Sequence, residues 1–515
     1  MGEGEGSNDS TGEEAPSPSA THVDDPDDDE DEKSEGIEED DRVSEETETE
    51  ENDSFTTWTA SFERLLQNLG KKVLRGVGRK MKIFSLCSGL DGATLGARSV
   101  IGPENVRHVV SADSAACSRE FILANFDPEH LYGDINSFLD EDGLNLPPHC
   151  FICDKPCSAV NEIECDLLLA GFPCPPYSTL NSKRWGPDHK PFNTKDGSVF
   201  IAISRWLRSL DVPPKMVILE NVPGLAFKDK TTGRRPLDFL MDGRLRGGEQ
   251  IGLNFLSDYL PMQVFDFAAE HCGLPMRRSR LFLVLVRKDI GTEAMIDAAK
   301  ASARHLQSHQ LPQVDLDFFW CEMDMPESRM KTPAHQFPRR ALEASTAIRS
   351  KYKLADIFTA NGSPASSAPD AYGITKLPRR EQDVLDVALL CCEAWEAKGS
   401  GWVLEDLVAD LSQQADREPW WRSRVGSLHG RSKIWFRGKL MSIGTMFTIV
   451  GWPTYDPDVV LKIPDVISRP QMIQMLGNIC TPPQLGAILM CLLCEIDIGS
   501  DSEMSIDDRA RRALS

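Results

Sequence analysis

The stretch DLLLAGFPCPP, residues 166–176, decides the fold. Its first half is an apolar run without polar alternation, which predicts a strand that is buried on both faces. Its second half places Cys174 between Pro173 and Pro175, and prolines on both sides of a thiol favour neither helix nor strand. The pattern therefore predicts a buried strand that ends in a stiff turn carrying one cysteine.

Further apolar runs of the same kind occur at KIFSLCSG (82–89), VRHVVSAD (106–113), KMVILEN (215–221) and RLFLVLV (280–286). Segments with apolar residues at helical spacing lie between them, at 94–101, 118–126 and 198–210. This alternation predicts an α/β fold, a doubly wound and mostly parallel sheet of the Rossmann-like kind. Ligands of such sheets gather at the carboxyl ends of the strands.

The charge of the chain is unevenly distributed. Residues 1–53 hold 24 acidic and only two basic residues, so this segment accounts for most of the net charge of −24 and is predicted to be disordered. The other predicted segments are a lead-in helical segment (54–80), a catalytic core (81–290), a smaller lobe (291–430), a return to the core (431–498) and a flexible tail (499–515). The sequence has no secretory signal and no run of 18 apolar residues, so its 14 cysteines indicate reduced thiols in a cytosolic or nuclear protein.

The expected strand ends are rich in Gly, Asp, Cys and Glu. In order along the chain they are SLCSGLDG, SAD, GDI, GFPC and ENVPG. Together with LMSIGTMFTIVGWP and MLGNICTPP near the C-terminus, they resemble the motifs of the (cytosine-5) DNA methyltransferase family, over about half of the chain. The resemblance implies a methyltransferase that uses S-adenosyl-L-methionine, with a target-recognition lobe at 291–430. It also implies double-stranded DNA as substrate, a nuclear location and chromatin proteins as further partners.

The resemblance assigns four catalytic residues. Cys174 is the nucleophile, Glu220 grips the cytosine, and Arg278 and Arg280 support the ring. The chemistry requires these types, because C5 of cytosine becomes nucleophilic only after a thiolate adds at C6. A carboxyl group and guanidinium groups can then hold the charge that develops on the ring, and the base must first leave the duplex stack.

The same resemblance assigns the cofactor site. Asp113 holds the ribose hydroxyls, and Asp134 with Ile135 reads the adenine. The other residues assigned to this site are Phe84, Ser85, Cys87, Ser88, Gly89, Leu90, Phe172 and Asn478.

Four positions depart from the family pattern. Pro175 follows the cysteine where Gln or Asn is usual, Met276 replaces a Gln, the motif around Gly444 lacks an acid, and Cys87-Ser88-Gly89 replaces a commoner Gly-Gly. Two alternatives to DNA methylation stay open. One is the tRNA-methylating branch of the family. The other, which Pro175 and Met276 favour, is an inactive homologue that binds chromatin.

A second cysteine cluster comprises Cys150, Cys153, Cys157 and Cys165, with His149 alongside. Four sulfurs could hold a structural zinc ion, but the spacing is irregular, so we expect thiols without a metal. Basic residues recur at Lys71-Lys72, Arg79-Lys80, Arg277-Arg278, Arg339-Arg340 and in the run Arg431, Lys433, Arg437 and Lys439, where phosphate contact is a hypothesis. The acidic segment 1–53 is a candidate competitor of DNA for these faces.

Overall fold

The computed structural model describes residues 57–75, 79–140, 142–179, 181, 194–228, 233–245, 247–312, 315–325, 339–354, 377–454 and 460–498. The acidic segment 1–53 and the tail 499–515, for which no fixed structure is expected, lie outside the described residues. The predicted catalytic core (81–290), smaller lobe (291–430) and return to the core (431–498) all fall within one compact unit, Phe55–Ser515.

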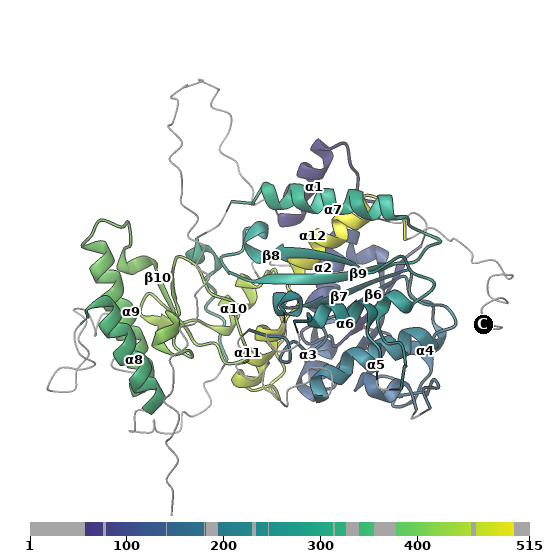
Figure 1. Cartoon of the computed structure of the whole chain (residues 1–515), viewed down its shortest axis with the longest axis horizontal. Coiled ribbons are helices and arrows are strands. Elements are labelled where there is room, and N and C mark those ends of the chain that lie inside the picture. The colour runs from purple at the N-terminus through teal and green to yellow at the C-terminus, as the bar shows by residue number, and fades with distance from the viewer. Residues whose placement is uncertain are drawn as a thin grey trace, which may run out of the picture. The chain divides into compact units, whose positions relative to one another are not determined.

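A nine-stranded sheet is the main element of this unit (Figure 1). Its strands, in spatial order, are β5 (Lys155–Pro156), β4 (His149–Cys150), β3 (His130–Tyr132), β2 (Val106–Ala112), β1 (Met81–Leu86), β6 (Leu167–Ala170), β7 (Met216–Asn221), β9 (Ser279–Val286) and β8 (Gln263–Ala268). Strands β3, β2, β1, β6 and β7 pair in parallel. The α/β class with a mostly parallel sheet is thereby confirmed.

One strand of the expected parallel set runs the other way. Strand β9, the RLFLVLV run, pairs antiparallel with β7 and with β8. No crossover helix separates β8 from β9, since the chain turns back through the short 3-10 helix Ala269–Cys272. An apolar run reveals burial on both faces but not direction, and a strand can be buried in this way in either orientation.

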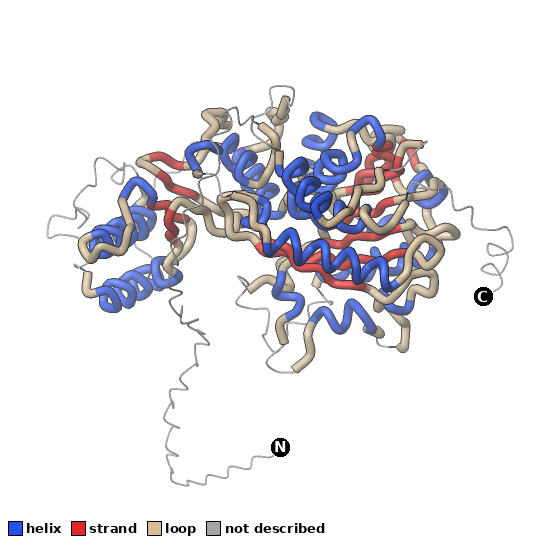
Figure 2. The backbone as a smooth tube through the Cα atoms, turned by 90° about the horizontal axis from the view of Figure 1, so that it is seen from above, coloured by secondary structure: helices blue, strands red, loops and turns tan. Residues whose placement is uncertain are grey.

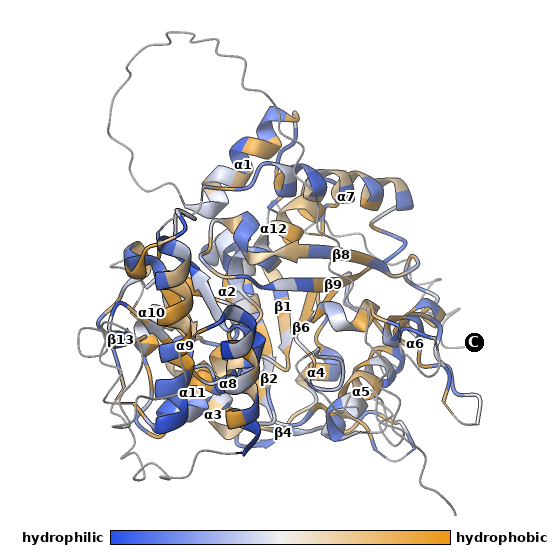
Figure 3. Ribbon diagram, turned by 60° about the vertical axis from the view of Figure 1, so that its left-hand side comes forward, coloured by the Kyte–Doolittle hydropathy of each residue, from blue (hydrophilic) through white to orange (hydrophobic). Residues whose placement is uncertain are grey.

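Helices cover both faces of the sheet, and successive residues of one strand show this. In β6, Leu167 and Leu169 join one apolar core while Leu168 and Ala170 join the other. The first core includes side chains of α1 (Trp58–Asn68), α2 (Gly92–Ile101), α3 (Ala116–Asn125), α7 (Glu293–Ser308) and α12 (Pro482–Leu493). The second includes α4 (Ala159–Glu162), α5 (Lys195–Ser209) and α6 (Pro236–Asp242). Strands β1 and β6 between these layers are predominantly hydrophobic (Figure 3).

Helix α12 returns the C-terminal part of the chain to the core, as the sequence predicts. Its Pro482 and Pro483 occupy the first helical positions, where a missing N–H costs nothing. It packs against α1, α2 and α7. The stretch Arg469–Leu493 is long and apolar enough to cross a membrane, but 94% of its apolar window is buried inside the fold, which is typical of a core helix.

A second, antiparallel sheet has the order β11 (Trp420–Arg422), β10 (Leu407–Asp410), β12 (Ile434–Phe436) and β13 (Lys439–Leu440). Helix α9 (Arg379–Glu396) contacts β10, and α8 (Arg339–Tyr352) contacts α9 (Figure 2). Two more helices, α10 (Ile443–Ile449) and α11 (Arg469–Asn478), pack against each other before α12.

The boundaries predicted for the smaller lobe need correction at both ends. Helix α7 falls within 291–430 but packs against α12 and β8 of the main sheet. Strands β12 and β13 fall within the predicted return, 431–498, yet β12 pairs with β10 of the small sheet. The short strands after His429 carry no sequence signal that separates them from the core, because IWF is apolar in either place.

Candidate active site

A cavity of about 380 Å³ opens at the carboxyl ends of the parallel strands. It is lined by eleven of the residues that the sequence assigns: Cys87, Gly89, Asp113, Asp134, Ile135, Phe172, Cys174, Glu220, Arg278, Arg280 and Asn478. The volume lies in the range of ligand-binding pockets. One continuous space therefore joins the glycine turn after β1 to the cysteine after β6.

Cys174 lies in a turn that its own carbonyl closes. This oxygen accepts hydrogen bonds from the N–H groups of Tyr177 (2.9 Å) and Ser178 (3.0 Å). On the other side, Asn221 of β7 donates through Nδ2 to the carbonyl of Phe172 (2.9 Å). The turn is thus fixed at both ends, as the flanking prolines indicate. Burial raises the pKa of the Cys174 thiol, Arg280 opposes that shift, and the Glu220 carboxylate adds to it.

Glu220, at the end of β7, faces the same cavity and is paired. Arg280 Nε lies 2.6 Å from Glu220 Oε1, and both side chains are 9% exposed. Burial raises the pKa of Glu220, and the charges of Arg280 and Arg278 oppose the shift. Gly171 lies beside this carboxyl group, since a Cβ there would be in van der Waals contact with Glu220 Oε2, at 3.4 Å.

Arg278 lines the cavity, and its terminal nitrogens bind the backbone. Its guanidinium donates to three backbone carbonyls: from Nη1 to Leu428 (3.2 Å), from both Nη atoms to Gly477 (3.2 Å each) and from Nη2 to Ile479 (2.5 Å). Burial and the neighbouring Arg280 lower its pKa to about 9. Because its terminal nitrogens bind the backbone, Arg278 is a positioning residue that joins β9 to the loop at Leu428 and to the end of α11.

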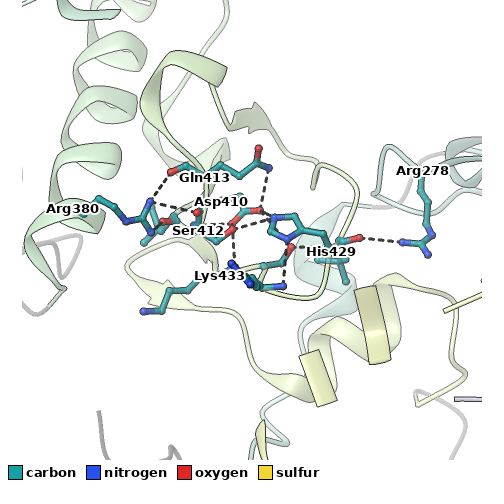
Figure 4. A network of polar contacts seen from close by, with 11 residues as sticks. Arg278, Arg380, Asp410, Ser412, Gln413, His429 and Lys433 are labelled. Carbon is teal, nitrogen blue, oxygen red and sulfur yellow. Dashed lines mark hydrogen bonds and ion pairs between the residues drawn. The ribbon is translucent and has the colours of Figure 1, made fainter. Parts of the chain in front are cut away.

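A polar network continues from the loop that Arg278 holds (Figure 4). Asp410 of β10 accepts hydrogen bonds from Ser412 Oγ (2.6 Å), His429 Nε2 (3.1 Å) and the N–H of Lys433 (3.1 Å). Burial alone would raise the pKa of Asp410, but the bonds from His429 and Ser412 bring it to about 2. Both His429 contacts use Nε2, so the Ser412, His429 and Asp410 set is a structural anchor and not a nucleophile triad.

The other end of the cavity carries two carboxylates. Asp113, after β2, accepts hydrogen bonds from the N–H groups of Gly89 and Ala115, both at 2.8 Å. Burial raises the pKa of Asp113 despite these bonds. Asp134, after β3, caps the 3-10 helix Ile135–Phe138 by accepting from the N–H of Asn136 (3.0 Å). The turn that follows β1 holds Cys87 at φ 51°, a backbone conformation that is uncommon for residues other than glycine.

Four residues assigned to the cofactor do not line the cavity. Phe84 and Leu90 are buried in the two apolar cores. Ser85 Oγ donates to Asp91 Oδ1 (2.7 Å), and Ser88 Oγ donates to the carbonyls of Ser85 and Ala112. These four residues support the strand and the turn through burial and hydrogen bonds without lining the cavity.

Sequence reasoning missed several residues that line the cavity. They are Ser114, Ala115, Cys117, Ser118, Gly133, Asp196, Val199, Gln471, Gln474 and Met475. The last three belong to α11, whose start could have been found from the capping box of Ser468 and Gln471. The resemblance assigns only the last residue of this helix, Asn478, to the site, and the earlier residues were missed because their contact with the cavity depends on the tertiary fold.

Several of the basic residues are neutralised by acidic neighbours. Lys71 pairs with Glu495, Arg79 with Asp166, Lys433 with Glu381 and Arg437 with Asp317. Arg277 and Arg431 are exposed. Among the described residues no side-chain partner of these two arginines is found.

Residues 81–317 match the family model of the C-5 cytosine-specific DNA methylases. This part of the chain belongs to the C-5 cytosine-specific DNA methylase family. The match covers β1 to the segment after α7, and therefore includes Cys174, Glu220, Arg278 and Arg280.

Curated relatives within this family are similar over part of their length. The Type II methyltransferase M.NgoBV of Neisseria gonorrhoeae is 28% identical over 207 residues, which is 40% of this chain and 41% of that protein. M.BsuFI of Bacillus subtilis is 29% identical over 234 residues, 45% of either chain. The DNA (cytosine-5-)-methyltransferase M.ApeKI of Aeropyrum pernix is 24% identical over 192 residues, 33% of this chain and 39% of that protein. The chain thus matches less than half of the length of these relatives.

Solved structures align over more of the chain but less closely. The S. pombe Dnmt2 methyltransferase and the Entamoeba histolytica methyltransferase EhMeth are each 12% identical and cover 81% of this chain and 98% of their own. Both have a TM-score of 0.39, and nothing about the substrate follows from a likeness of that size.

Proposed function

We propose that this protein transfers a methyl group from S-adenosyl-L-methionine to C5 of cytosine in double-stranded DNA. The observation that carries the proposal is the single cavity that connects Cys174 and the Glu220–Arg280 pair with Asp113 and Asp134. A cysteine, a buried carboxyl group and a guanidinium at one end supply the groups that cytosine activation needs.

The other end of the cavity fits the cofactor. Two carboxylates, Asp113 and Asp134, line it together with the turn at Gly89, and carboxylates are suitable acceptors for ribose hydroxyls and an adenine amino group. Asn478, Gln471 and Gln474 add amide groups from the opposite side. S-adenosyl-L-methionine, when bound there, supplies an electrophilic methyl group.

The residues of the chain act on a cytosine that has left the duplex stack. The Cys174 thiol gives its proton to solvent water, and the thiolate forms a bond to C6, so that electron density moves to C5. Protonated Glu220 donates to N3 and stabilises the charge of the adduct. Arg280, 2.6 Å from Glu220, orients this carboxyl group and favours the thiolate of Cys174.

The adduct breaks down after C5 has accepted the methyl group. Solvent water accepts the proton from C5, the C5–C6 double bond forms again, and the S–C6 bond breaks with its electron pair returning to Cys174. The enzyme thus leaves the cycle with its thiolate restored, and the pyrimidine has gained a methyl group in place of one proton.

Incorporation of labelled methyl groups tests the substrate. The full chain is incubated with tritiated S-adenosyl-L-methionine and either duplex DNA or tRNA. We expect label in the DNA, at C5 of cytosine after nucleoside digestion. Label in tRNA alone would support the tRNA-methylating branch instead, and label in neither would contradict the proposed activity.

A further inference from the structure

Three cysteines and one histidine meet at the edge of the main sheet, away from Cys174. His130 lies on β3, Cys150 on β4, Cys153 in the turn after β4, and Cys157 directly after β5. The ligand atoms of His130, Cys153 and Cys157 all lie within 4.8 Å of one another. The Cys150 sulfur lies 3.8 Å from the same His130 nitrogen, Nδ1.

The distances to His130 Nδ1 fit a single tetrahedral ion, with Cys153 and Cys157 in one compact group with His130 and the Cys150 sulfur outside that group. The sulfurs of Cys153, Cys157 and Cys150 lie 3.5, 3.6 and 3.8 Å from His130 Nδ1. A zinc ion about 2.3 Å from sulfur and about 2.0 Å from nitrogen, with tetrahedral angles, separates the two ligand atoms by about 3.5 Å. Three thiolates and one imidazole in this geometry are typical of zinc. A multi-iron cluster needs its ligand atoms farther apart than this set allows.

The local fold also suggests that a metal is needed. Strands β4 and β5 have two residues each, and Phe151 and Ile152 in the turn between them are 43% and 42% exposed. A hairpin of this size buries too little apolar surface to be stable on its own. The turn places Asp154 at φ 51° and brings the N–H of Cys153 to 3.5 Å from Cys150 Sγ. Metal binding supplies folding free energy where an apolar core cannot.

We propose that Cys150, Cys153, Cys157 and His130 bind one structural zinc ion. This replaces the sequence-based expectation of metal-free thiols and changes the fourth candidate ligand. Cys165 is buried, and its sulfur lies 4.0 Å from the carbonyl of Lys82 on β1. Strand β2 separates β1 from β3, so Cys165 is not part of the cluster at His130. His149 Nε2 lies 3.7 Å from Asp154 and not in the sulfur cluster. His130 is separated from Cys150 by 20 residues, so spacing alone does not reveal it.

The hairpin of β4 and β5, which carries Cys150 and Cys153, borders the cofactor end of the cavity. The ring of Phe151 lies 4.2 Å from the guanidinium carbon of Arg119. Arg119 Nη1 in turn donates to the carbonyls of Asp113 and Ser114, both at 2.9 Å. Zinc therefore orders the strand edge on which the backbone of Asp113 depends. The connection between zinc and the cofactor end of the cavity rests on the proposed function, whereas zinc binding does not.

Metal analysis of the full chain tests the proposal. The protein is purified under reducing conditions without added metal, and its zinc and iron are measured by inductively coupled plasma mass spectrometry. We expect about one zinc per chain. Cobalt exchanged into the site should show the thiolate charge-transfer and tetrahedral d–d absorption bands of a three-sulfur, one-nitrogen site. Less than about 0.2 zinc per chain, or iron in place of zinc, would overturn the proposal.

Variants identify the ligands. We expect His130→Ala and Cys153→Ser to lose most of the zinc, and Cys165→Ala to keep it. Retention of zinc by both His130→Ala and Cys153→Ser, or its loss in Cys165→Ala alone, would overturn the ligand set. Because the native chain is measured first, a variant that fails to fold does not decide the outcome. A variant that loses zinc but still forms a covalent complex with a duplex containing 5-fluorocytosine would leave the proposed function intact. This outcome would separate zinc binding from the proposed methyl transfer.

Discussion

At the scale of single residues, the site is governed by two raised pKa values in one buried space. Burial raises the pKa of both Cys174 and Glu220, and Arg280 moderates both shifts. The proposed reaction needs a Cys174 thiolate together with a protonated Glu220, so Cys174 must lose its proton while Glu220 keeps one.

The pH dependence of kcat/KM follows from these directions. Below both pKa values the thiolate fraction grows with pH, and above both the protonated fraction of Glu220 falls, so the profile is a bell. We expect its lower inflection above 4.5 and its upper inflection above 9.0, the ordinary values for these groups. The Glu220→Gln variant should lose activity and also lose the decline at high pH. Inflections at or below the ordinary values would contradict this assignment.

Arg278 is expected to contribute to stability more than to chemistry. The Arg278→Gln change removes bonds to the carbonyls of Leu428, Gly477 and Ile479 and leaves buried acceptors without donors. We expect a loss of about 2–4 kcal/mol in the free energy of unfolding, measured with urea. The exposed neighbour gives a matched control, because Arg277→Gln should stay within about 0.5 kcal/mol of the native chain. Equal stability of both variants would show that the three carbonyl bonds do not hold the loop.

At the scale of elements, glycines of α2 allow this helix to pack closely against the start of the last helix, α12. A Cβ on Gly92 would lie 2.3 Å from the carbonyl oxygen of Cys480, and one on Gly96 would lie 2.5 Å from that of Pro482. Both atoms are backbone, so neither can move aside without shifting α2 against α12. This close approach holds the glycine turn next to the end of α11.

A single methyl group tests this packing. Gly96→Ala improves helix propensity, yet we expect it to destabilise the protein by about 1–3 kcal/mol because α2 and α12 must separate. Ser99→Ala on the exposed face of α2 is the matched control and should be nearly neutral. Chemical denaturation compares the two, and a stabilised Gly96→Ala protein would rule out the tight contact.

The elements were largely predictable and their arrangement was not. The apolar runs locate β1, β2, β6, β7 and β9 because burial on both faces removes polar alternation. The direction of β9 and the pairing of β12 with β10 depend on tertiary contacts that short apolar runs do not encode. For the same reason, Cys174 and Glu220 were found from their strand ends, whereas His130 and Gln474 were missed.

At the scale of the whole molecule, several basic side chains of the described residues pair with acidic neighbours, whereas Arg277 and Arg431 are exposed. Arg277 lies beside the small sheet, since its N–H donates to the carbonyl of Val425 (2.9 Å). A Cβ on Gly430, next to Arg431, would lie 3.3 Å from Gln474, which lines the cavity. The two exposed arginines thus lie next in sequence to residues at or near the cavity, and under the proposed function we expect them to contact DNA phosphates.

The salt dependence of DNA binding tests this. We expect Arg277→Gln and Arg431→Gln each to reduce the slope of log K against log salt by about 1. Arg339→Gln serves as control, because Arg339 is 92% exposed and pairs with Glu343 within one helix, and its slope should be unchanged. Equal slopes for all three variants would remove the phosphate contacts.

The central claim is that Cys174 attacks a cytosine held beside Glu220, and covalent trapping tests it most directly. The full chain is incubated with S-adenosyl-L-methionine and a duplex that contains 5-fluorocytosine, whose fluorine cannot leave as a proton does. We expect a complex that survives denaturing electrophoresis, absent in Cys174→Ala and retained in Cys494→Ala, a cysteine outside the cavity. A native chain that forms no complex, or a Cys174→Ala chain that still forms one, would contradict the account.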